Sequence, residues 1–250
     1  MPMERPALLA SLLAGVCLAS PQVSGQGSRD GAELARRVAR AVGAEGFAAV
    51  RALRFTWRHE RKGLARTYRW DVAAGRVCCR SGADEATVPA AGWTGAPPSK
   101  AEERLHRAWV NDGFWALAAL HLAWDEGYAA EDLGLQPVPG FPALGPRRAL
   151  RVRYGPRGGY TPGDAYVFYL DAEDRPVAWA FHRGGAPAPT LVTAWEDFVE
   201  RGGLRLPTRF RAPDGSTLIR ILDLAVERDE GPASRPASRP ASRPGAPAKD

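Results

Sequence analysis

The sequence predicts an α+β protein in which a large antiparallel sheet curls, with a helix before the strands and a helical insertion between them. Three observations predict this fold class. Apolar residues follow a helical period from Asp30 to Val42 and a period of two from Leu53 onward. A second helical stretch interrupts the strands at 99–124, and strand patterns return from Arg148 to Arg228. Large antiparallel sheets in proteins with few helices tend to curl, and a curled sheet can enclose an interior.

The composition supports a folded, soluble protein. Of 250 residues, 45% are hydrophobic and 25% are charged, which is close to the average for globular chains. A mainly disordered chain and a multi-span membrane protein are therefore excluded. The net charge is +6, but it is spread along the chain, and no dense basic stripe or nucleic-acid motif is present. The sequence therefore predicts no nucleic-acid partner.

The first helix is expected to present Leu34, Val38 and Val42 on one face, with Asp30 as its N-cap and Gly43 as its end. Three antiparallel strands are expected next, each with one apolar and one polar face. They cover Leu53–His59, Arg66–Val72 and Arg76–Arg80.

The helical insertion is expected to begin at Ser99, which forms a capping box with Glu102. Asn111-Asp112-Gly113 is expected to break it before a more apolar segment, Phe114–Trp124.

About six strands are predicted after the insertion. Pro213-Asp214-Gly215 lies between apolar runs and predicts a hairpin. Ala165–Leu170 is apolar on both faces, which predicts a strand covered on both sides. The predicted strands are 149–155, 165–171, 177–183, 191–200, 204–212 and 216–228.

Both termini differ from the folded middle. Residues 1–25 have the pattern of a secretory signal peptide. Their uncharged run, from Ala7 to Ala19, has the length of a signal-peptide core and is too short to span a bilayer comfortably. An uncleaved anchor is the alternative, and lipidation of Cys17 is disfavoured because Val16 precedes it. Residues 229–250 repeat Pro-Ala-Ser-Arg and predict a disordered tail. The mature protein is therefore expected to be periplasmic or extracytoplasmic, soluble or peripherally associated with a membrane.

Eight tryptophans are many for this length, and aromatic residues either form a core or line an apolar pocket. Both interpretations remain open from the pattern alone. If a cavity exists, the candidate lining residues are Trp57, Trp70, Trp115, Phe168, Trp179 and Trp195.

No catalytic or metal-binding motif is evident, so the sequence predicts neither an enzyme nor a cofactor or metal. The four histidines form no close pair, and neither a GxSxG elbow nor a P-loop spacing occurs. Cys78 and Cys79 are adjacent, cannot easily bond to each other, and are expected to be one buried and one partly exposed thiol. An intermolecular disulfide remains an alternative. The acidic pairs, which are expected to be solvated, are Asp84-Glu85, Asp125-Glu126 and Glu196-Asp197.

Several segments of the folded middle follow a familiar pattern. They are Trp109–Trp115, Tyr160–Asp171, and Ala194–Phe198 followed by Gly203–Pro207. With the order of the elements, they resemble the LolA/LolB-like superfamily of periplasmic lipoprotein-localisation carriers. The resemblance implies that residues 26–228 form a half-open β-barrel whose mouth is closed by helices.

The same resemblance implies a non-enzymatic exported protein that binds a lipid or a lipoprotein acyl chain in an apolar cavity. The alternative is an interaction module that has a filled core, takes no small ligand and contacts an envelope protein. A hydrolase with an unrecognised site is a third hypothesis.

Overall fold

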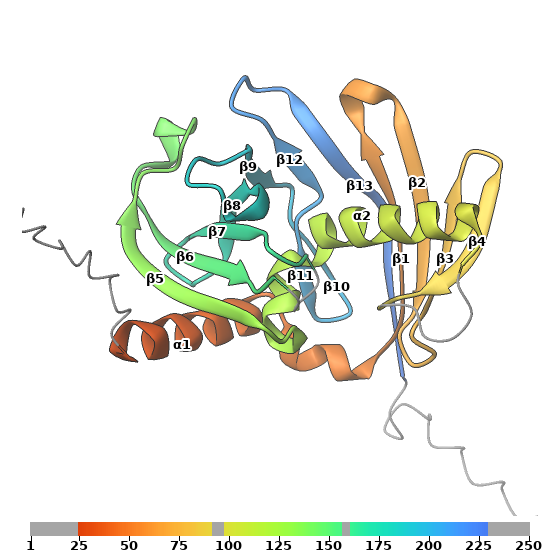
Figure 1. Ribbon diagram of the computed structural model, residues 1–250, viewed down its shortest axis with the longest axis horizontal. Helices are drawn as coiled ribbons and strands as arrows, with labels where there is room; N and C mark the ends of the chain where they lie inside the picture. The colour runs from red at the N-terminus through yellow and green to blue at the C-terminus, as the bar shows by residue number, and fades with distance from the viewer. Residues whose placement is uncertain (1–24, 92–97, 157–160, 230–250) are drawn as a thin grey trace, which may run out of the picture.

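Figure 1 shows the computed structural model of the protein, which describes residues 25–91, 98–156 and 161–229. The α-helices are α1 (Gly25–Ala41) and α2 (Lys100–Trp124). Short 3-10 helices are η1 (Ala44–Ala49), η2 (Glu60–Lys62), η3 (Pro142–Leu144) and η4 (Arg183–Gly185). The strands are β1 (Val50–His59), β2 (Leu64–Asp71), β3 (Arg76–Ser81), β4 (Asp84–Pro89), β5 (Tyr128–Gln136), β6 (Arg147–Tyr154), β7 (Ala165–Leu170), β8 (Pro176–His182), β9 (Leu191–Glu196), β10 (Val199–Arg201), β11 (Leu204–Leu206), β12 (Arg209–Arg211) and β13 (Thr217–Arg228).

The predicted α+β class with a large antiparallel sheet is confirmed. Eleven strands form one sheet in the order β4-β3-β2-β1-β13-β12-β9-β8-β7-β6-β5, and β10 pairs separately with β11. The edge strands β4 and β5 do not pair with each other, so the sheet is not closed. The strands rotate relative to one another across the sheet, which is therefore curved, and α2 lies on the concave side (Figure 1).

A bulge bends the centre of the sheet. The register between β1 and β13 shifts between Arg54 and Thr56, and Asp223 on β13 has a positive φ of 53°. Bulges of this kind increase local twist and bend the strand that carries them. They therefore help the sheet to curve around the helix.

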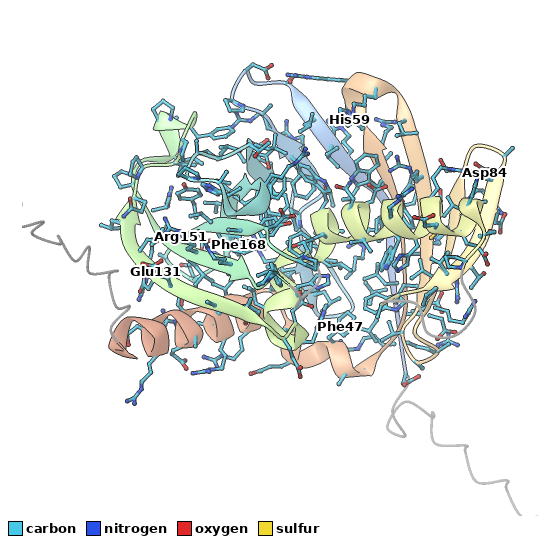
Figure 2. All side chains as sticks on the ribbon, in the orientation of Figure 1. Phe47, His59, Asp84, Glu131, Arg151 and Phe168 are labelled. Carbon is cyan, nitrogen blue, oxygen red and sulfur yellow. The ribbon has the colours of Figure 1, made fainter. Side chains whose placement is uncertain are left out.

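The core lies between the concave face of the sheet and α2. Alternate residues of β1, such as Leu53, Phe55 and Trp57, are buried there, as their period of two predicted. A smaller apolar cluster covers the other face of β7, where Val167 and Tyr169 pack with Phe141. The prediction that β7 is covered on both sides is thus confirmed. Elsewhere the outer face is charged, and Arg151 of β6 pairs with Glu131 of β5 (Figure 2).

The beginning of α2 agrees with the prediction, but the predicted break does not. Ser99 Oγ accepts a hydrogen bond from the Glu102 amide at 3.2 Å, and Glu102 Oε2 accepts one from the Ser99 amide at 2.9 Å. The helix then continues through Asn111-Asp112-Gly113. Asp112 bonds to side chains on the sheet rather than to nearby backbone, and a Cβ on Gly113 would lie 3.1 Å from the Trp109 ring. Both residues therefore serve packing against the sheet, not helix termination.

The limits of several other elements also correct the predictions. Helix α1 begins at Gly25, so Asp30 lies inside it and is not its N-cap. Gly43 follows the helix with a φ of 88°, as expected of a helix end. The hairpin of β12 and β13 around residues 213–215 is confirmed.

Two predicted strands are divided in the structure, and two others were not predicted. Residues 191–200 form β9 and β10 because Asp197, between them, has a positive φ of 52°. Residues 204–212 form β11 and β12 because Pro207 cannot donate to a strand ladder. Strands β4 and β5 were missed, since Glu85, Glu131 and Asp132 obscure their alternation.

The predicted signal peptide, residues 1–25, and the predicted tail, residues 229–250, lie outside the described residues except for Gly25 and Asp229. Among the helices of the described ranges, none combines the length and the apolar character needed to cross a membrane.

Candidate functional site

An open cavity of about 920 Å³ lies between α2 and the concave face of the sheet. Ligand pockets commonly measure roughly 300–1,000 Å³ and are mostly apolar. The walls come from the β1–β2 hairpin, from the middle of α2, and from the adjoining ends of β7, β8, β9 and β13. His59 lies at the hairpin end of this region (Figure 2).

Three of the six predicted aromatic residues line this cavity. Trp57 is on β1, Trp115 is on α2 and Trp179 is on β8. The rings of Trp115 and Trp179 meet edge to face with centroids 5.1 Å apart, so helix and sheet contribute to one aromatic wall. Each of the three side chains is less than a tenth exposed. Their positions are fixed by packing before any ligand arrives.

The structure places the other three predicted residues outside the lining. Trp70 lies toward the opposite end of β2 and packs against Phe47 and Trp109. Phe168 contacts Trp179 and Trp195 in the core, with ring centroids 6.4 and 6.0 Å away (Figure 2). Trp195 packs against Phe210, at the end of β9 away from the cavity residue Leu191. These three residues belong to the filled part of the core, as the alternative interpretation of the aromatic residues expected.

Tyr166 and Phe181, which were not among the predicted lining residues, extend the aromatic wall. Tyr166 stacks on Trp179 at 5.2 Å and on Phe181 at 5.3 Å. The signal was present, because Phe181 follows Trp179 by two positions and Tyr166 precedes Phe168 by two. Further apolar residues of the lining, not singled out from the sequence, are Leu64, Val110, Phe114, Leu191, Leu218 and Ile219.

A buried polar cluster supports the wall formed by α2. The Asp112 carboxylate is fully buried and accepts hydrogen bonds from Tyr68 Oη at 2.6 Å and Arg66 Nη1 at 2.5 Å. Asn111 donates to its second oxygen at 2.8 Å. Burial raises the pKa of the Asp112 carboxyl against the opposing effect of these donors, and burial together with the nearby carboxylate raises the pKa of Tyr68. The cluster fastens α2 to β2.

Arg66 connects this cluster to the cavity. Its guanidinium bonds to Asp112 and lies 5.0 Å over the ring of Trp57. The residue is also part of the cavity lining. Asp112 therefore fixes the position of a cation on the cavity wall.

The mouth of the cavity is polar. Lys62 in η2, Arg107 in α2 and Arg183 in η4 belong to the lining, with His59 and His106 nearby and Asp164 as the acidic member. Burial, followed by the charges of Lys62, Arg61 and Arg66, lowers the pKa of His59. His59 is therefore biased toward its neutral form.

Within the described ranges, no group of three or more His, Cys, Asp or Glu side chains is placed to hold a metal ion. Two of the acidic pairs bind arginines. Asp84 and Glu85 pair with Arg104 and Arg80, while Glu196 and Asp197 both pair with Arg209. These carboxylates stabilise the surface of the sheet rather than face the cavity.

The third acidic pair and the cysteines also lie outside the cavity lining. Asp125 accepts from Tyr154 Oη at 2.7 Å and lies 2.9 Å from His121 Nδ1, which secures the end of α2 on β6. Cys79 is buried and Cys78 is half-buried, both unbonded, in agreement with the sequence. Burial raises the pKa of the Cys79 thiol to about 12, which keeps it protonated at neutral pH.

Comparison with protein-family models and with curated proteins gives no match for this chain.

Proposed function

We propose that the protein is a non-enzymatic binding protein that shelters a lipid or acyl chain in the cavity beneath its curled sheet. The observation that carries the proposal is the open cavity of about 920 Å³ with Trp57, Trp115 and Trp179 in its walls. In this proposal the sheet acts as a half-open barrel and α2 as its partial cover. The relationship to LolA/LolB-like carriers, the export of the chain and a lipoprotein acyl chain as cargo belong to the same proposal.

Burial of a hydrocarbon chain supplies the driving force. Each CH₂ group removed from water contributes about 0.8 kcal/mol, so ten groups contribute roughly 8 kcal/mol before the costs of association. The aromatic wall needs little reorganisation, because its rings already contact one another. A preformed wall reduces the entropy lost on binding. The cavity thus favours a carrier over the alternative of an interaction module with a filled core.

Binding of a fluorescent palmitate analogue tests the proposal. The variant Val110→Arg puts a charge on the apolar helix wall and is expected to weaken binding at least about tenfold, because an unpaired charge disfavours burial of the chain. Leu135→Arg is the matched control, since Leu135 is 74% exposed and lies outside the lining. Fluorescence titration measures the affinities, and circular dichroism checks that both variants fold.

Absence of saturable binding to the wild type would refute the proposal. Equal binding by the two variants, when both are folded, would place the chain somewhere other than this cavity. Native mass spectrometry of the gently purified protein is expected to show copurified lipid.

A further inference from the structure

The cavity combines an apolar interior with a mouth of predominantly positive charge. Among the described residues, its lining holds four cationic side chains, Lys62, Arg66, Arg107 and Arg183, and one carboxylate, Asp164. The cations come from three separate parts of the chain, the β1–β2 hairpin, α2 and the end of β8. The fold therefore gathers them around one cavity.

Two of these cations are neutralised by neighbours and two are not. Arg66 bonds to Asp112, and Arg107 lies 3.3 Å from Glu103. Lys62 and Arg183 form no ion pair within 4 Å with any described residue, and both are exposed. Asp164, the carboxylate of the lining, accepts from the backbone amide of Gly184. Lys62 and Arg183 are thus available to an incoming anion.

We propose that the ligand is an anionic amphiphile, whose acyl chain lies against Trp57, Trp115 and Trp179 and whose carboxylate or phosphate group lies between Lys62 and Arg183. This inference rests on the proposed function and adds the chemical class of the head group. A positively charged opening with low-dielectric walls concentrates anions and orients an amphiphile with its chain inward.

The surroundings of His59 support a positive potential at the mouth. Burial lowers its pKa first, and the charges of Lys62, Arg61 and Arg66 lower it further. On the facing helix the nearby groups are His106 and Arg107, so no carboxylate of the lining from that side offsets these cations. Nδ1 of His59 is also buried without a hydrogen-bond partner among the described residues. The charged side chains that act on His59 are therefore all cationic.

Probes that share the palmitoyl chain and differ only in head group test the inference. Palmitate and palmitoyl-lysophosphatidylglycerol carry an anion, whereas monopalmitoyl glycerol is neutral. Each probe displaces the fluorescent palmitate analogue from the wild type and from the double variant Lys62→Gln/Arg183→Gln. The matched control is Arg54→Gln/Lys100→Gln, which removes the same charge from exposed positions outside the lining.

The wild type is expected to bind the anionic probes roughly tenfold more tightly than the neutral one, as two exposed charge interactions allow. The double variant is expected to lose this preference and keep its affinity for monopalmitoyl glycerol, while the control keeps both. The ratio between palmitate and the lysophospholipid then identifies the head group as carboxylate or phosphate.

Equal affinity of the wild type for all three probes would overturn the inference and leave the proposed function standing. An equal loss of preference in the control variant would also overturn it, because net charge alone would then be responsible. Binding of inorganic phosphate as tightly as palmitate would indicate an anion site without a chain site. Failure of every palmitoyl probe to bind would overturn both proposals.

Discussion

Asp112 shows how a single side chain connects the fold to the cavity. It lies in the middle of α2 with no exposed surface, and its partners Tyr68 and Arg66 are 44 and 46 residues away in the sequence. A buried carboxylate is costly unless it is paired and hydrogen-bonded, and Asp112 has donors on both oxygens. Its bond to Arg66 also holds that guanidinium over Trp57.

Replacement of Asp112 by alanine is expected to lower the free energy of unfolding by about 3–5 kcal/mol, because Arg66 and Tyr68 would lose their shared acceptor. Asp112→Asn keeps one acceptor oxygen and is expected to lose less. Urea denaturation followed by tryptophan fluorescence measures both. Asp84→Ala is the control, since its ion pair with Arg104 is exposed and is expected to contribute no more than about 1 kcal/mol. Equal losses for Asp112→Ala and Asp84→Ala would contradict a role for the buried cluster.

For single residues of the site, the sequence could predict which face of a strand a side chain lies on, but not which residues meet at the cavity. Alternation in β1 and β2 correctly gave the face of Trp57 and Trp70, because one face of each strand is buried. It could not give position along the strand. Trp57 pairs with Arg66 near the cavity, whereas Trp70 pairs with Leu53 farther away. The hydrogen bonds of Asp112 also could not be predicted, because Arg66 and Tyr68 become its neighbours only in the folded protein.

At the scale of elements, α1 packs unusually close to β5. A Cβ on Gly31 would lie 2.2 Å from the carbonyl oxygen of Ala130, so only glycine allows this approach. Leu34 and Val38 of the same helix are fully buried. The helix thus lies against an edge strand, and Figure 1 shows the two side by side. Proteins commonly cover sheet edges in this way to prevent pairing with other chains.

Gly31→Val is expected to lower the free energy of unfolding by about 1–3 kcal/mol, because the helix must move away from the backbone of β5. Arg36→Val, at an exposed position of the same helix, removes an exposed ion pair with Glu33 and is expected to change stability by no more than about 1 kcal/mol. Thermal unfolding by circular dichroism compares them. A Gly31→Val protein as stable as the Arg36→Val control would show that α1 can shift without cost.

Element prediction succeeded where one face was apolar and failed where both faces were mixed. The period of two revealed β1, β2 and β7, because burial on at least one face selects that pattern. Strand β5 is half exposed along its length and contains Glu131 and Asp132, so its alternation is weak. The apolar residues of α2 were recognised, but its continuity depends on a contact with the sheet that no local pattern contains.

At the scale of the whole molecule, β13 joins two groups of strands into one sheet. It pairs with β1 on one side and with β12 on the other, between strands β1–β4 and a second group made of β5–β9 and β12. Helix α2 contacts both groups, through Trp109 with Tyr68 and through Trp115 with Phe210. The two groups therefore share one core.

Because of this shared core, the two groups of strands are expected to unfold together in a single transition. Far-ultraviolet circular dichroism, near-ultraviolet circular dichroism and tryptophan fluorescence should give coincident urea curves. Ile221→Ala, in the buried centre of β13, is expected to lower the midpoint of all three curves equally, with a loss of about 2–5 kcal/mol. Separate transitions for the different probes would show that the groups are independent units.

The place of β13 in the sheet also affects how the protein can be made. Its residues, Thr217–Arg228, are translated after every strand that they join. Until they emerge from the ribosome, β1 and β12 each keep a row of unsatisfied backbone groups facing an empty position. A nascent chain of this topology cannot complete its sheet until the last of the described strands has been made.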